Sequence, residues 1–126
     1  MSKRCVLVAE DDDSQRELFT FMLTTAGFDV RPVATGSAAL AELKRWQPDV
    51  ILTDIMMPDM DGLELVQLVK GKADLSHIPI VVMTAYGKGY LSQAWALGAQ
   101  GTIAKPFAPE DLFMALLQVL PEVQGQ

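Results

Sequence analysis

The strongest constraint on the fold is a regular alternation of short apolar runs with stretches of helical periodicity. Five runs have the apolar pattern of β-strands, and a helical stretch follows each of them. The runs are residues 5–9, 28–33, 50–53, 78–83 and 101–104. This order predicts an α/β fold, a doubly wound five-stranded parallel sheet with five helices and right-handed crossovers.

The ends of the helical stretches carry ordinary start and stop signals. Ser14 and Glu17 match a capping box that would open the first helix, and Gly27 would end it. The expected core stripe of this helix comprises Leu18, Phe19, Met22, Leu23 and Ala26. The other helices are predicted near residues 35–46, 63–70, 88–97 and 109–120.

Length and composition exclude several classes of protein. A chain of 126 residues fits one domain, 1–126, with 121–126 as a short C-terminal tail. No apolar run approaches the ~20 residues that cross a bilayer, and the N-terminal apolar run is too short for a signal peptide. With a single cysteine there is no disulfide framework, so a cytoplasmic location without membrane insertion is expected. The net charge of −6 disfavours direct nucleic-acid binding.

Chemically distinctive side chains stand where the predicted strands end. Glu10 and Asp11 directly follow the first strand, and Asp54 directly follows the third. Thr84 follows the fourth strand and Lys105 follows the fifth. Ligands of open parallel sheets bind at the carboxyl ends of the strands, so these groups are predicted to share one site.

This set of groups suits a phosphoryl site. Three neighbouring carboxylates repel one another unless a cation lies among them, and oxygen ligands without His or Cys select Mg²⁺. Thr84 offers a hydroxyl and Lys105 a charge to phosphoryl oxygens. Asp54 could then act as the nucleophile that forms an acyl phosphate. Each residue alone has an ordinary explanation, such as acids at a helix N-terminus, and the joint placement carries the interpretation.

Four segments of the chain resemble a known family. Residues 6–12, 54–62, 83–85 and 105–107 read VLVAEDD, DIMMPDMDG, MTA and KPF. They are similar, in order and spacing along the whole chain, to the receiver domain of bacterial two-component response regulators, and the chain looks like a stand-alone, chemotaxis-regulator-like member. The resemblance implies a flavodoxin-like sheet of strand order 2-1-3-4-5.

The resemblance also implies a phosphoacceptor and a metal site. Asp54 would take a phosphoryl group from a phosphohistidine of a sensor histidine kinase or a histidine phosphotransfer protein. Glu10, Asp11, Asp54 and the main-chain carbonyl of Met56 would hold Mg²⁺. Glu10 stands where Asp is commoner in the family, and metal binding is expected to survive because the carboxylate is kept.

Further roles follow from the same resemblance. Thr84 and Lys105 would bind the phosphoryl oxygens, and the peptide bond between Lys105 and Pro106 would be cis. Gly62 would lie where a side chain obstructs the backbone. Position 102, usually aromatic in the family, is Thr102 here, so the usual coupling of the switch to a buried ring is not expected.

Two bulky residues are expected to govern the lifetime of the phosphorylated state. Met56 lies two residues after the acceptor and Tyr86 two residues after Thr84. In similar domains these positions flank the path of the attacking water, so slow self-dephosphorylation is predicted. Beyond this self-catalysed phosphoryl acceptance and loss, no enzymatic turnover of a substrate is expected.

The implied partners are proteins. Besides the phosphodonor, a downstream protein target is expected, and the fourth helix, fifth strand and fifth helix form the family's output or homodimer face. Two other functions compete with this interpretation. One is a phosphatase of the haloacid dehalogenase type, whose nucleophile signature Asp59–Gly62 superficially matches, although Pro58 precedes it. The other is a docking scaffold that is never phosphorylated, against which the full set of five site residues argues.

Overall fold

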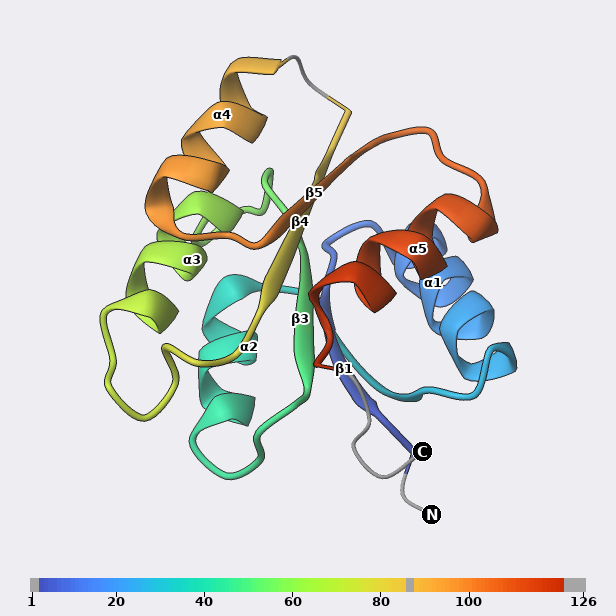
Figure 1. Cartoon of the computed structure of the whole chain (residues 1–126), viewed down its shortest axis with the longest axis horizontal. Coiled ribbons are helices and arrows are strands. Elements are labelled where there is room, and N and C mark those ends of the chain that lie inside the picture. Colours follow the sequence, from blue (N-terminus) through green and yellow to red (C-terminus); the bar gives the residue numbers. More distant parts are fainter. Residues whose placement is uncertain (1–2, 86–87, 122–126) are drawn as a thin grey trace.

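The computed structural model describes residues 3–85 and 88–121. Its five strands form one parallel sheet in the order β2-β1-β3-β4-β5 (Figure 1). The strands are β1 (Cys5–Ala9), β2 (Asp29–Val33), β3 (Val50–Asp54), β4 (Ile80–Thr84) and β5 (Gly101–Ala104). The predicted fold class and strand order are thereby confirmed.

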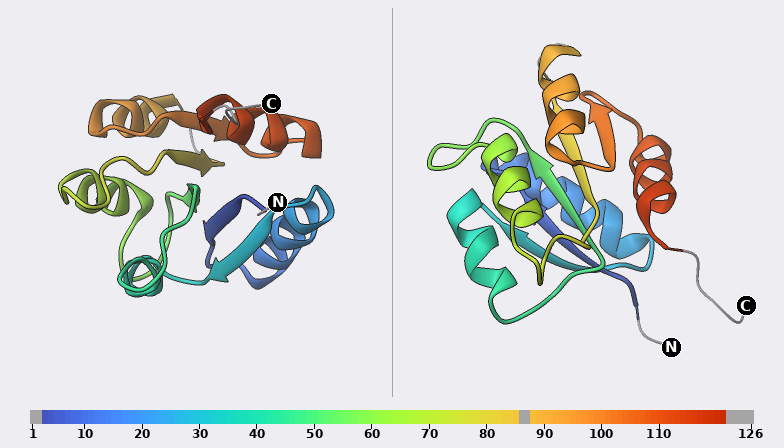
Figure 2. Two further views of the ribbon diagram at one scale, coloured as in Figure 1. Left: turned by 60° about the horizontal axis from the view of Figure 1, so that its bottom comes forward. Right: turned by 60° about the vertical axis from the view of Figure 1, so that its left-hand side comes forward.

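The helices cover both faces of this sheet. They are α1 (Asp13–Thr25), α2 (Gly36–Leu43), α3 (Gly62–Lys70), α4 (Lys88–Leu97) and α5 (Pro109–Val119). Helices α1 and α5 lie on one face, while α2, α3 and α4 lie on the other (Figures 1 and 2). This is the doubly wound arrangement that the alternation of strands and helices predicts.

Each face of the sheet has its own apolar core. One core joins side chains of α2, α3 and α4 to the sheet, and the other joins those of α1 and α5. The residues of β3 and β4 are all buried, which explains their continuous apolar sequence. Strand β2 lies at one edge of the sheet, as its Pro32 indicates, since proline has no N–H with which to donate to a neighbouring strand.

The first helix differs from its predicted form. It begins at Asp13, and Asp12 is the N-cap, because its side chain accepts a hydrogen bond from the backbone N–H of Gln15. Ser14 therefore lies inside the helix, and the predicted capping box is wrong. Leu18 is 52% exposed, so it lies outside the core stripe, in which Phe19 and Leu23 are buried.

Other element boundaries shift by a few residues. Helix α2 ends at Leu43, three residues before the predicted end at Trp46. Strands β3 and β4 each extend one residue further and include Asp54 and Thr84 as their last residues. The backbone of these two residues is consequently fixed by strand pairing.

In the part of the chain that the structure describes, each helix is too short or too polar to cross a membrane. The cytoplasmic location stays a prediction. Of the predicted tail, 121–126, only Pro121 lies among the described residues.

Candidate functional site

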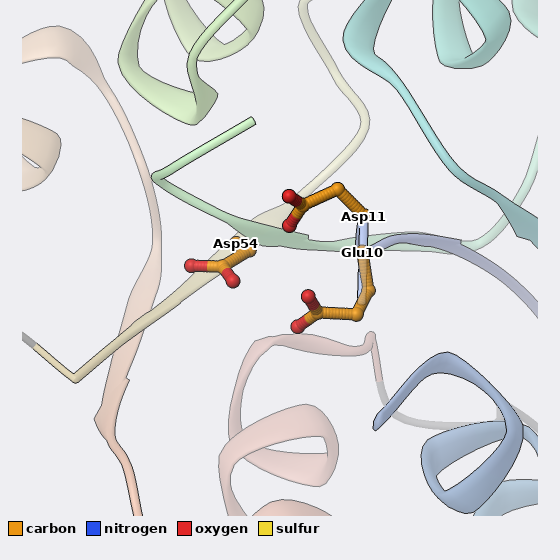
Figure 3. A group of neighbouring side chains, drawn as sticks. All are labelled: Glu10, Asp11 and Asp54. Carbon is orange, nitrogen blue, oxygen red and sulfur yellow. The ribbon is translucent and has the colours of Figure 1, made fainter. Parts of the chain in front are cut away.

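Strands β1 and β3 are neighbours, and their pairing brings the acidic residues together. Ala9 pairs with Thr53 in the parallel register, so Glu10 and Asp54 stand side by side at the carboxyl end of the sheet. Asp11 follows Glu10 on the same loop. One carboxylate oxygen of each of the three residues lies within 4.8 Å of those of the other two (Figure 3). The predicted acidic cluster therefore exists.

Glu10 is a buried carboxylate, with 1% of the residue exposed. Its Oε1 accepts a hydrogen bond from Lys105 Nζ at 2.8 Å, and its Oε2 accepts one from the backbone N–H of Asp12 at 3.1 Å. Burial raises the pKa of Glu10 to about 7, since desolvation outweighs the hydrogen bonds that favour the charged form. Glu10 is thus poised to exchange a proton near neutral pH.

Asp54 is also buried, and both of its oxygens have partners. Its Oδ1 accepts from the backbone N–H groups of Ile55 and Met56 at 2.7 and 3.4 Å. Its Oδ2 accepts from Lys105 Nζ at 2.9 Å. These contacts fix the orientation of the carboxylate at the end of a fully buried strand. Asp11, in contrast, is exposed to solvent.

Lys105 connects the fifth strand to the acidic cluster. Its Nζ donates to Glu10, to Asp54 and to Gln15 Oε1, the last at 2.6 Å. Burial alone would lower the pKa of Lys105, but the hydrogen bonds to Glu10 and Asp54 raise it above its usual value. The peptide bond to Pro106 is cis, as the resemblance implies.

Thr84 lies at the same end of the sheet as the cluster. It is the buried last residue of β4, and its carbonyl accepts a hydrogen bond from the backbone N–H of Lys105 at 2.8 Å. Thr102 is half-buried on β5, where it pairs with Val82. Met56 is 45% exposed beside the acceptor. Tyr86, the second residue expected to govern the phosphoryl lifetime, lies outside the described residues.

The loop after β3 folds back closely on the acceptor. The N–H of Gly62 donates to the carbonyl of Ile55 at 2.7 Å, and a Cβ at Gly62 would lie 2.2 Å from the carbonyl oxygen of Asp54. The expectation that a side chain is excluded at Gly62 is therefore confirmed. On the same loop Asp59 is exposed and accepts a hydrogen bond from the N–H of Ser37, away from the cluster. This placement argues against Asp59 as a phosphatase nucleophile.

The donor set of this site fits a hard divalent cation. Three carboxylates converge here, and one ammonium, that of Lys105, neutralises part of their charge. All of the converging ligand atoms are oxygens, which suit Mg²⁺ better than zinc or copper. The N–H of Met56 points to Asp54, so its backbone also lies beside the cluster. The residues that the sequence singles out for Mg²⁺ are thus compatible with one.

One contact of the site was missed from the sequence. Gln15, in the first turn of α1, contributes its side-chain oxygen to Lys105. Its position in the sequence could have indicated this contact, because Gln15 lies about one helical turn after Asp11, on the helix that follows β1. Which way a side chain in that turn points depends on where the helix begins, and the misplaced N-cap concealed it.

Comparison with known proteins agrees with the fold and with the family that the sequence resembles. Residues 6–117 match the protein family described as "Response regulator receiver domain". A probable transcriptional regulator, ycf27 of Porphyridium aerugineum, is 34% identical over 98% of this chain. The chain covers 50% of that relative, and 46% of the DNA-binding response regulator MtrA of Mycolicibacterium smegmatis, so it spans about half the length of these relatives.

Solved structures agree with this match. The chemotaxis response regulator CheY4 of Vibrio cholerae superposes with a TM-score of 0.87 at 35% identity, over 94% of this chain and 100% of that one. The receiver domain of the sensor histidine kinase PA1611 of Pseudomonas aeruginosa has a TM-score of 0.85 at 26% identity, over 93% and 97%, and holds a magnesium ion in its active-site cleft. This chain belongs to the family of response regulator receiver domains, which are phosphorylation-dependent signalling domains.

Proposed function

We propose that Asp54 is the phosphoacceptor of this receiver domain and that Glu10, Asp11, Asp54 and the main-chain carbonyl of Met56 hold Mg²⁺. The observation that carries the proposal is the buried carboxylate of Asp54, oriented by two backbone N–H groups and by Lys105, at the centre of the acidic cluster. A bound Mg²⁺ would offset the negative charge of the carboxylates and of the incoming phosphoryl group.

The chain's own residues account for the transfer of the phosphoryl group. A carboxylate oxygen of Asp54 forms a bond to phosphorus while the bond from phosphorus to the donor's imidazole nitrogen breaks, and its electron pair leaves with the imidazole. Lys105, already within hydrogen-bond distance of Asp54, donates to a phosphoryl oxygen. Thr84, the buried last residue of the neighbouring strand β4, would donate its hydroxyl to another phosphoryl oxygen.

The partners of this domain are proteins. The phosphodonor is a sensor histidine kinase or a histidine phosphotransfer protein, and phosphorylation changes the contacts with a downstream target. The exposed apolar side chains Trp95, Met114 and Leu117 lie on α4 and α5, the elements that frame the expected output or homodimer face. Relatives such as ycf27 extend beyond the part that this chain matches. A downstream target, or a further segment of the kind those relatives have, would bind this face.

Intact-mass measurement after incubation with acetyl phosphate and Mg²⁺ tests this function. The unsubstituted protein is expected to gain one phosphoryl group, whereas Asp54→Asn gains none because it lacks the nucleophilic oxygen. The exposed Asp13→Asn is the matched control and is expected to gain the group. Removal of Mg²⁺ by a chelator should abolish the gain.

The same measurement, followed after the donor is removed, reports the lifetime of the acyl phosphate. We expect a slow decline, because the bulky Met56 stands exposed beside the acceptor and hinders the attacking water. Phosphoryl uptake that is undiminished in Asp54→Asn would contradict the assignment of the acceptor. An acyl-phosphate half-life that is unchanged when Met56 is replaced by the smaller, polar Asn would contradict the role of Met56.

A further inference from the structure

The ammonium group of Lys105 has three N–H donors, and all three are used. Two go to carboxylates, Glu10 Oε1 at 2.8 Å and Asp54 Oδ2 at 2.9 Å. The third goes to the neutral side-chain oxygen of Gln15, at 2.6 Å, which is the shortest of the three distances. The position of the ammonium is therefore set by two charged acceptors and one uncharged acceptor.

The side chain of Gln15 is itself held in place by the start of α1. The backbone N–H of Gln15 donates to the N-cap Asp12 at 2.9 Å. The next residue, Arg16, donates from its guanidinium to the carbonyl of Glu10 at 2.9 Å, which ties the same turn to the end of β1. These two hydrogen bonds hold the first turn of α1 against the end of β1. The half-buried side chain of Gln15 extends from this turn to Lys105.

The surroundings of Lys105 on this side are otherwise apolar. Its Nζ lies 5.7 Å from the centre of the Phe19 ring, which stacks on Phe107. These side chains line a cavity of about 360 Å³ between α1 and the loop after β5, together with Gln15 and Lys105. Without the Gln15 oxygen, one N–H of the ammonium would face this cavity, and Lys105 would shift toward the carboxylates or toward solvent.

We propose that Gln15 is a positioning residue that holds the Lys105 ammonium in the place from which it meets the phosphoryl group. The proposal rests on the proposed function. The other two acceptors change during the transfer, because Asp54 loses its negative charge when it becomes an acyl phosphate and Glu10 faces the incoming metal. The amide of Gln15 stays uncharged throughout the transfer, and its oxygen keeps its position. It is the constant anchor of Lys105.

The test compares the rate of phosphoryl uptake from acetyl phosphate at saturating Mg²⁺ in the unsubstituted protein and in four variants. Gln15→Met, which keeps the length of the side chain and removes the strong acceptor, is expected to slow uptake about tenfold, the effect of roughly one hydrogen bond to a charged group. Lys105→Met slows uptake as well. In the double variant, Gln15→Met is expected to add no further slowing, because Gln15 acts through Lys105. The exposed Gln67→Met on α3 is the matched control and should retain the normal rate.

A rate of uptake in Gln15→Met equal to that of the unsubstituted protein would overturn the proposal. The same holds if Gln15→Met slows uptake equally with and without Lys105, since a merely structural effect on α1 would do so. A second measurement does not depend on phosphorylation, namely the NMR signal of the Lys105 ammonium. Slow hydrogen exchange of this group should be seen in the unsubstituted protein and lost in Gln15→Met. If the protein takes up no phosphoryl group, the proposed function fails, while unchanged exchange in the variant would refute the anchor itself.

Discussion

The central strand β3 and the edge strand β5 place their functional side chains in different ways. Strand β3 is buried along all five residues and pairs with β1 and β4. Strand β5 pairs with β4 alone among the described strands, and of its residues only Gly101 is buried. Asp54 ends the first strand, whereas Lys105 follows the second.

The two side chains are held by different kinds of contact. The carboxylate of Asp54 is oriented by backbone N–H groups directly after a buried strand, so sheet packing positions it. Lys105 has a long side chain beyond an exposed edge, and it is positioned by side-chain acceptors on other elements. Changes at the centre should therefore damage the fold as well as the site, whereas changes at the edge should be tolerated by the fold.

The greatest loss of stability should follow replacement of Gly62, the glycine that packs against the end of the central strand β3. In Gly62→Ala the new Cβ would lie 2.2 Å from the carbonyl oxygen of Asp54 and 2.9 Å from Ile55 Cα, both backbone atoms of the centre. We expect a loss of roughly 3 kcal/mol or more in the free energy of unfolding, because the backbone cannot yield without breaking the sheet. Urea denaturation measures this loss.

Gly89→Ala is the matched substitution away from the centre, on α4. Among the described residues, no heavy atom outside this stretch of the helix lies within 4 Å of the added Cβ, and alanine favours a helix, so stability should stay the same or rise by up to about 1 kcal/mol. Equal losses in the two variants would show that the loss in Gly62→Ala does not come from the close contact with the end of β3.

Without Mg²⁺, the stability of the protein should depend on pH because of Glu10. In the folded protein, burial raises the pKa of Glu10 to about 7, whereas in the unfolded chain this carboxyl has its usual pKa. Between these two values the folded state binds more protons, so the free energy of unfolding falls as the pH rises through this range. We expect the fall from this one group to be on the order of 2 kcal/mol between pH 5 and pH 8.

Urea denaturation at several pH values in the presence of a chelator measures this slope. Glu10→Gln cannot titrate and should lose this part of the slope. Glu110→Gln, an exposed residue at the start of α5 near the edge, should keep it. Parallel slopes in the protein and in Glu10→Gln would show that Glu10 is not a buried, proton-exchanging group.

The inner strands of the sheet were easier to predict from the sequence than the start and orientation of the first helix. The inner strands β1, β3 and β4 stand out as continuous apolar runs, and Glu10, Asp54 and Thr84 mark their carboxyl ends. The family resemblance implied the strand order, which no local pattern encodes. The structure brings Glu10, Asp11, Asp54 and Lys105 together and places Thr84 at the same end of the sheet, as the sequence predicts, because strand ends leave little freedom in where a side chain can lie.

What the sequence did not reveal depends on helix phase. Several acidic and hydroxyl residues in a row offer competing N-caps, and periodicity alone did not separate Asp12 from Ser14. With the helix start misplaced, Leu18 was assigned to the core although it is exposed, and Gln15 was not connected to Lys105. The rotation of a helix about its axis is settled by its tertiary contacts, which a single sequence does not show.

Two threonines, one on the central strand and one on the edge strand, should differ only slightly in their contributions to stability. Thr53 is wholly buried on β3, and its hydroxyl donates to the carbonyl of Asp54 at 2.9 Å. Thr53→Val keeps the shape of the side chain but leaves that carbonyl with one donor fewer, which should cost about 1 kcal/mol. Thr102→Val on β5 changes a half-buried residue of the edge strand and should stay within about 0.5 kcal/mol of the unsubstituted protein. Urea denaturation of both variants is the measurement. A larger loss of stability in Thr102→Val than in Thr53→Val would contradict the expectation that the fold tolerates substitutions on the edge strand better than on the central strand.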